Sequence, residues 1–175
     1  TVDAFIADEE ARRELYYRVH DMVRLMQPHE REEILSEIEE KYGAAPVRSS
    51  HRYMTEEELK DLARSQYITI GGHTVTHSRL SMLSREKQRD EIEGSVRCLE
   101  KIMNKKVTTF SYPFGGREDY NVDSIAIVQE MNLKTVSNFP GRVYHDTSLF
   151  ELPRQIVRNW DRTTFPVMFQ SFWYN

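Results

Sequence analysis

The sequence predicts an α/β fold in which parallel strands alternate with helices. Strand patterns at 67–70, 107–112 and 134–137 are separated by helical patterns that begin at Ser84 and at Asn121. This order is typical of parallel βαβ units, in an open doubly wound sheet or in a barrel. The chain has 175 residues, 39% of them hydrophobic, which is enough for one domain with a core.

The N-terminal part predicts two helices. The first runs from about Asp8 to Gln27, and the second begins at Pro28, where the missing N–H costs nothing, and ends at Gly43. We therefore expect a helical hairpin at 1–45, as an insertion or extension, and the α/β domain at 46–175. Residues 44–52 form the expected linker.

Charge and composition exclude several classes of protein. The net charge is −4, and residues 1–45 hold twelve acidic against six basic residues, which leaves +2 for the rest. Neither part has the basic stripe of a nucleic-acid binder, so we expect no nucleic-acid partner. The sequence contains no run of eighteen apolar residues, so no membrane span is predicted. The lone Cys98 excludes an intrachain disulfide, and we expect it to be a packed thiol on a helix.

Local signals define the helices of the second part. Thr55 and Glu58 have the spacing of a capping box, and Ser84 caps a longer helix. The apolar stripes of the three helices after the linker contain Leu59 and Leu62; Ile92, Val96, Leu99 and Met103; and Ile125, Val128 and Met131. Beyond them we expect a strand at 155–160 and a last helix from Thr163 or Thr164. The aromatic stripe of that helix, Phe165, Phe169, Phe172 and Trp173, is predicted to be core.

Two histidines directly follow the first predicted strand. His73 and His77 lie four residues apart behind Gly71 and Gly72, so a helical turn or tight loop brings both imidazoles to one side, where they could hold a divalent metal. No Glu lies between them, which excludes the H-E-x-x-H helix of metalloproteases. Such a pair can also fill a core edge with both nitrogens satisfied. Ligands of α/β folds cluster at the carboxyl ends of strands, which favours the metal site.

The second strand also ends in a constrained turn, F-S-Y-P-F-G-G-R, at Phe110–Arg117. Pro113 fixes its own φ and keeps Tyr112 extended, while two glycines allow a sharp exit. A tight βα turn is the simplest interpretation. Its place at the same strand end as the histidines favours the wall of an active site.

These residues resemble the polysaccharide deacetylases, the family four carbohydrate esterases. G-G-H-T-V-T-H-S-R-L resembles their second motif and F-S-Y-P-F-G their third, over about 53–161 of the chain. The resemblance implies His73 and His77 as metal ligands, with Zn as the expected ion. It also implies a substrate groove formed by Tyr112, Pro113, Phe114 and Gly115. The implied fold is a distorted (β/α) barrel, incomplete at the N-terminus, with an N-terminal helical segment.

The chain departs from the family pattern in three places. Ser111 stands where Arg usually opens the third motif. The first motif, T-F-D-D, which supplies the catalytic-base Asp and the third metal ligand, is only poorly matched by residues 1–4, so we expect the base upstream of Thr1. The segment 152–161 lacks the catalytic-acid His, and the weaker candidates there are Arg158, Trp160 and Asp161. His145 and Asp146 are interpreted as surface residues.

The activity implied by the resemblance is metal-dependent removal of acetyl groups from the N-acetylated sugars of a polysaccharide or oligosaccharide. The alternatives are a catalytically inactive saccharide-binding domain of the same fold and a structural α/β domain with satisfied histidines. A missing first strand would leave the edge at 67–70 open, so we also expect a homo-oligomer that covers it.

Overall fold

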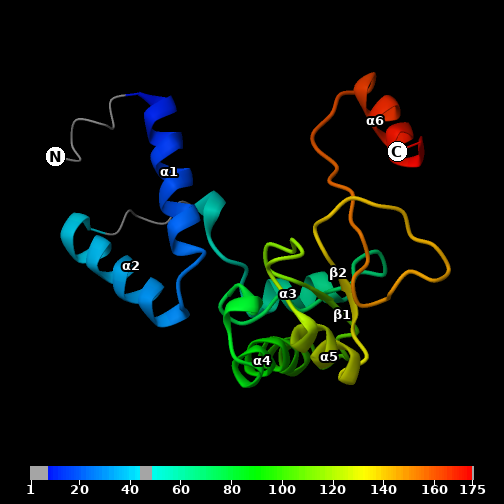
Figure 1. Cartoon of the computed structure of the whole chain (residues 1–175), viewed down its shortest axis with the longest axis horizontal. Coiled ribbons are helices and arrows are strands. Elements are labelled where there is room, and N and C mark those ends of the chain that lie inside the picture. Colours follow the sequence, from blue (N-terminus) through cyan, green and yellow to red (C-terminus); the bar gives the residue numbers. More distant parts are fainter. Residues whose placement is uncertain (1–7, 44–48, 175) are drawn as a thin grey trace. The chain divides into compact units, whose positions relative to one another are not determined.

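The computed structural model describes residues 8–43 and 49–174, and the chain divides into two compact units, 1–52 and 53–175 (Figure 1). The first unit contains α1 (Glu9–Val23), α2 (Pro28–Tyr42) and the short 3-10 helix η2 (Ser49–His51). The predicted bounds of α2 are confirmed, and Gly43 ends it at φ 77°. The first helix ends four residues before Gln27, because i→i+3 hydrogen bonds such as Leu25 N–H to Met22 O tighten the chain into a turn.

The apolar side chains of the two helices in this first unit are not buried. Neither α1 nor α2 contains a buried residue among those described. Large hydrophobic side chains are exposed on both helices: Leu15, Tyr16, Tyr17, Met22, Leu35, Ile38 and Tyr42.

The second unit contains the α/β part of the chain. Its elements are α3 (Glu56–Ala63), η3 (Leu80–Met82), α4 (Arg85–Met103), β1 (Thr109–Ser111), α5 (Val122–Glu130), β2 (Lys134–Val136) and α6 (Thr164–Tyr174). The predicted caps are confirmed: the side chains of Thr55 and Ser84 accept backbone N–H groups at the starts of α3 and α4. Asn121, where a helix was predicted to begin, caps α5 in the same way.

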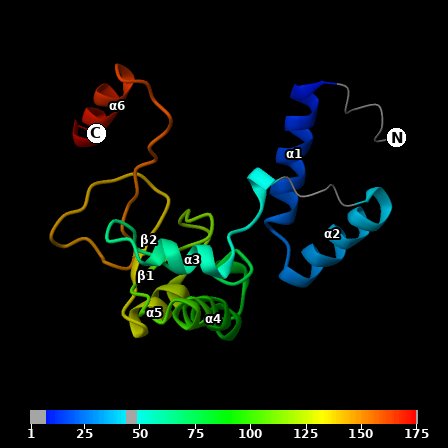
Figure 2. The same cartoon turned by 180° about the vertical axis from the view of Figure 1, so that it is seen from behind.

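The strands are parallel, as predicted. Phe110 of β1 is in register with Thr135 of β2, and α5 connects the two strands, so one βαβ unit is complete. Isolated parallel bridges, Gly72 to Phe110 and Val136 to Leu152, extend the arrangement by one segment on each side. Helices α4 and α5 contact each other, and both views show them side by side below the strands (Figures 1 and 2).

The core lies between these strands and helices. Its fully or nearly fully buried hydrophobic residues are Leu80, Leu83, Ile92, Val96, Val107, Phe110, Tyr112, Tyr120, Ile127, Val128 and Leu133. Gln88 is also fully buried, and its amide accepts a hydrogen bond from Ser124 Oγ at 2.6 Å and donates one to the Leu83 carbonyl at 3.0 Å. The bond from Ser124 connects α4 to α5, and together the two bonds satisfy both polar ends of the Gln88 amide.

Two predicted strands are wrong. In the described chain, residues 67–70 form no strand; Tyr67 is 88% exposed, and pairing begins only at Gly72, whose N–H donates to the Thr109 carbonyl. Residues 155–160 form none either, since pairing beside β2 is confined to Leu152. Apolar residues become a strand only where a neighbouring strand pairs with them, and in the described chain the bridges to β1 and β2 involve only Gly72 and Leu152. The described residues show parallel segments, and the closed barrel stays a prediction.

Two predictions about side chains are also wrong. Phe165 and Phe169 of α6 are 42% and 46% exposed, and they stack on each other with ring centroids 5.8 Å apart rather than forming core. Cys98 is exposed on α4, because it lies two residues, about 200°, away from the buried Val96. None of the helices in the described residues combines the length and the apolar character that crossing a bilayer requires.

Candidate functional site

The two histidines lie together in a tight loop after Gly72. Their ring centroids are 4.8 Å apart and the ring planes make an angle of 70°. Both side chains are exposed. The loop turns sharply because Thr74 and His77 have positive φ, 64° and 56°. The proximity expected from the i, i+4 spacing is therefore present, in a loop rather than a helical turn.

A backbone carbonyl fixes the orientation of the first ring. His73 Nδ1 lies 2.7 Å from the Ser111 carbonyl oxygen. A carbonyl can only accept, so Nδ1 carries the proton, and in the neutral ring the Nε2 lone pair is available to a ligand. Gly72 makes this approach to β1 possible, because a Cβ there would lie 2.8 Å from the Phe110 ring. Metal-ligating histidines are commonly held through the other ring nitrogen in this way.

The turn after β1 covers one side of the second histidine. The Phe114 ring meets His77 edge to face, with centroids 4.8 Å apart. Phe114 and Gly115 both have positive φ, 60° and 75°. The Gly115 carbonyl accepts the Asn138 N–H at 2.8 Å, and a Cβ on Gly115 would lie 2.9 Å from Asn138 N. The turn is thus fixed between the histidine loop and the segment after β2.

The Tyr112 side chain does not line an open groove, contrary to the expectation from the motif. Tyr112 is 1% exposed, stacks on Tyr120 at 4.0 Å, and donates its hydroxyl hydrogen to the Phe150 carbonyl at 3.0 Å. Burial raises the pKa of both tyrosines above the usual range. Pro113 is fully buried as well. Of the four motif residues, Phe114 therefore has its side chain against His77. Tyr112 supports the turn from the buried side.

Two of the three C-terminal candidates, Asp161 and Trp160, have structural contacts of their own. The Asp161 carboxylate accepts Thr163 Oγ1–H and the N–H groups of Thr163 and Thr164, which lowers its pKa to about 2 and caps α6. Trp160 packs against Phe165 and Phe172 of the same helix. Arg158 is exposed. Asp161 and Trp160 are thereby tied to the start of α6.

A hollow of about 350 Å³ adjoins the other end of the turn, and the motifs gave no indication of it. Its lining includes Arg117, whose guanidinium lies 4.2 Å from the Phe139 ring centroid, and Glu151, which accepts the Tyr120 hydroxyl at 3.0 Å. Thr147 and Ser148 add hydroxyl groups. An aromatic face beside hydroxyl, carboxylate and guanidinium groups is a lining that suits a polar organic ligand. Arg117 directly follows the glycines of the motif, which is the sequence signal that could have indicated it.

In the described part of the chain, the candidate metal ligands that lie together are the pair His73 and His77. No cluster of three or more His, Cys, Asp or Glu side chains able to hold a metal occurs in residues 8–43 and 49–174. Residues 1–4, which we compared with the first motif, lie outside the described residues. The exposed imidazoles and the hydrogen-bonded Nδ1 of His73 fit two positions of a zinc site, which in catalytic proteins has three protein ligands and one open position.

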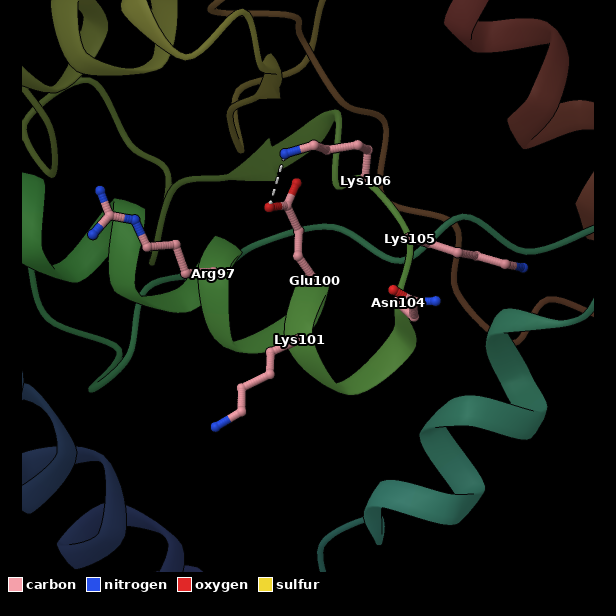
Figure 3. A pocket seen from close by; sticks show the side chains of 6 residues that line it. All are labelled: Arg97, Glu100, Lys101, Asn104, Lys105 and Lys106. Carbon is pink, nitrogen blue, oxygen red and sulfur yellow. Dashed lines mark hydrogen bonds and ion pairs between the residues drawn. The ribbon is translucent and has the colours of Figure 1, made fainter.

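A second hollow, at the amino ends of the strands, is lined by several basic residues whose charged groups do not converge on one point (Figure 3). Lys106 forms an ion pair with Glu100 at 3.3 Å, and Lys105 donates to the Ala63 carbonyl. Lys101 points away from both, as Figure 3 shows. Because these ammonium groups do not converge on one point, the hollow is a solvated surface rather than an anion site.

Comparison with known proteins agrees with this arrangement. Residues 20–136 match the sequence model of the family described as polysaccharide deacetylase, which takes in α2 as well as the motifs and ends before 152–161. The Bacillus subtilis (strain 168) protein YxkH, which carries the name of a polysaccharide deacetylase, is 27% identical over 103 residues, 58% of this chain and 36% of YxkH.

Two solved structures share the fold. The Streptococcus pyogenes deacetylase PplD, in complex with acetate, has a TM-score of 0.53 and 24% identity over 67% of this chain and 47% of its own. BC0361, a polysaccharide deacetylase from Bacillus cereus, has a TM-score of 0.53 and 18% identity over 69% of this chain and 41% of its own. The chain thus spans less than half of each of these relatives. The matched residues contain both motifs and the complete βαβ unit, and the chain belongs to the polysaccharide deacetylase family of hydrolases.

Proposed function

We propose that this chain carries part of the active site of a metal-dependent hydrolase that removes acetyl groups from the N-acetylated sugars of a polysaccharide. The observation that carries the proposal is the adjacent His73 and His77 pair, with His73 Nδ1 held by the Ser111 carbonyl. Both rings are exposed, which supports a binding role over the alternative of buried histidines with satisfied nitrogens.

The proposed metal ligands are His73 through Nε2 and the neighbouring His77. Imidazole nitrogens suit Zn²⁺. Bound zinc would polarise an amide carbonyl and lower the pKa of bound water to about 7. The residues of this chain would orient the two imidazoles and, through Phe114, exclude water from one side of His77.

For the substrate we propose an N-acetylated oligosaccharide or polysaccharide that crosses the turn at Phe114, whose side chain is partly exposed, while Pro113 and Gly115 are buried beneath it. The hollow lined by Arg117, Phe139 and Glu151 adjoins this turn and supplies hydrogen-bonding groups beside the Phe139 ring, which the Arg117 guanidinium covers on one face. A sugar presents several hydroxyl groups, which the guanidinium, carboxylate and hydroxyl groups of the lining can bind through hydrogen bonds.

An inactive saccharide-binding domain of the same fold is the second candidate. It is favoured by the lack of a third metal-ligating side chain or a carboxylate base beside the histidines in the described part of the chain. This candidate shares the hollow and the turn with the first but needs no zinc.

Zinc titration separates the two. We expect His73→Ala and His77→Ala each to weaken Zn²⁺ binding at least about tenfold in calorimetry and to abolish acetate release from an N-acetylated oligosaccharide in the protein as its gene encodes it. Thermal melts should change little, because both side chains are exposed. His145→Ala is the matched control, since His145 is 98% exposed in another loop. Oligosaccharide binding without zinc binding or acetate release would establish the inactive domain instead.

A further inference from the structure

A carboxylate on α4 holds the loop that carries both histidines. Glu91 Oε2 accepts the N–H groups of Val75 and Thr76, each at 2.9 Å. Its other oxygen, Oε1, accepts the Thr76 hydroxyl hydrogen at 2.7 Å. The three hydrogen bonds reach the two consecutive residues between Thr74 and His77, which puts Glu91 at the centre of the loop.

The loop also packs closely on α4. A Cβ on Gly94, three residues after Glu91, would lie 3.1 Å from the Val75 side chain. On the other side, Thr76 Oγ1 lies 2.6 Å from Oγ of Ser78, which is buried. Two consecutive N–H groups that point at one oxygen form the concave anion-binding arrangement found in protein loops. Here the anion is a side chain of the protein itself.

We propose that Glu91 is a positioning residue, which fixes His73 and His77 relative to each other so that both imidazoles can bind one divalent cation. The ends of the loop are otherwise set by positive φ at Thr74 and His77, a conformation that L-residues adopt reluctantly. The hydrogen bonds that Glu91 accepts stabilise the loop between these two residues. Without the carboxylate, two N–H groups lose their acceptor and the ring-to-ring placement relaxes. The proposal rests on the metal-ligand role given to the histidines above.

The test compares variants of two neighbouring acidic residues. Glu91→Ala should weaken Zn²⁺ binding about 10- to 100-fold, the range found when a group that orients a metal ligand is removed. Glu91→Gln should restore most of the affinity, because its amide oxygen can still accept the two N–H groups. Asp90→Asn and Asp90→Ala, on an exposed position of the same helix, remove the same charge and should leave the affinity unchanged.

Two measurements without metal complete the test. We expect Glu91→Ala to speed hydrogen exchange of the Val75 and Thr76 amides and to abolish the NOE between the His73 and His77 rings, while Asp90→Ala changes neither. An unchanged NOE and unchanged exchange in Glu91→Ala would overturn the proposal. If His73→Ala alters zinc affinity but Glu91→Ala does not, the positioning role fails and the metal site stands. If neither the parent nor any variant binds zinc, the proposed function fails, and the exchange and NOE measurements alone decide the role of Glu91.

Discussion

Removing one partner of the ion pair between Arg79 and Asp119 should destabilise the fold unusually strongly for a charged contact. Arg79 Nε lies 2.9 Å from Asp119 Oδ1, and the two side chains are 16% and 3% exposed. Asp119 Oδ2 also accepts the Gly116 N–H, and Arg79 donates to the Glu118 carbonyl. The pair therefore joins the chain just after His77 to the chain just after the 110–117 turn.

We expect Asp119→Asn to lower the free energy of unfolding by about 3 kcal/mol. Removing one partner of a buried pair costs about 3–5 kcal/mol, because an uncompensated charge stays behind. Two features point to the lower end of this range. The Arg79 Nε–H is poorly aligned with Asp119 Oδ1. Arg79 is also partly exposed to water and still donates a hydrogen bond to the Glu118 carbonyl.

Urea unfolding measures this difference, and Asp61→Asn is the matched control. Asp61 pairs with Arg64 at 2.5 Å, but these side chains are 70% and 74% exposed, so the loss should be below about 1 kcal/mol. Replacing both Arg79 and Asp119 by leucine should recover part of the loss, since no lone charge remains. Equal losses in Asp119→Asn and Asp61→Asn would refute the reasoning.

Three further predictions concern the turn, the tyrosines and the cysteine. Gly115→Ala should destabilise the fold by more than the roughly 1–2 kcal/mol of positive-φ strain, because its Cβ would lie 2.9 Å from Asn138. Gly43→Ala is the control in thermal melts, since Gly43 has φ 77° but open space around it. Equal effects of the two substitutions would contradict the role of the Asn138 contact. Because burial raises the pKa of Tyr112 and Tyr120, the stability that their protonated forms confer is complete below about pH 10, the unfolded pKa, and falls as the pH rises further. Tyrosinate absorbance should show Tyr112 and Tyr120 ionising only at a higher pH in the folded protein than in urea, and ionisation of these two tyrosines at the same pH in both states would argue against this. Cys98 should react with a thiol reagent in the folded protein as fast as in urea, and protection of the thiol would contradict its exposure.

Local signals predicted the helices of the second unit well. Caps at Thr55, Ser84 and Asn121 depend on residues within one turn of each other, so a short window of sequence contains the whole interaction. Strands were predicted less well, because their existence depends on partners far along the chain. Residues 67–70 and 155–160 have the composition of strands without the neighbours.

The candidate site shows the same division. The motif spacing placed His73 beside His77, as the structure has them. Tyr112 was misplaced, although the period of two in a strand puts it on the same face as the buried Phe110, and that pattern could have identified it as core. Glu91 gave no signal, since α4 carries several acidic residues, and only the rotation of the helix against the loop decides which of them meets Val75 and Thr76.

The left-handed backbone at Thr74 and His77 has a consequence for how this sequence can change. A threonine at φ 64° is less stable than a glycine would be in the same conformation, so the folded chain is not at its stability optimum here. Glycine would relieve that strain but would widen the range of conformations open to the loop between the histidines. Selection for thermal stability alone should therefore enrich glycine at position 74. Selection that also requires fixed relative positions of the two imidazoles should keep a residue with a side chain there.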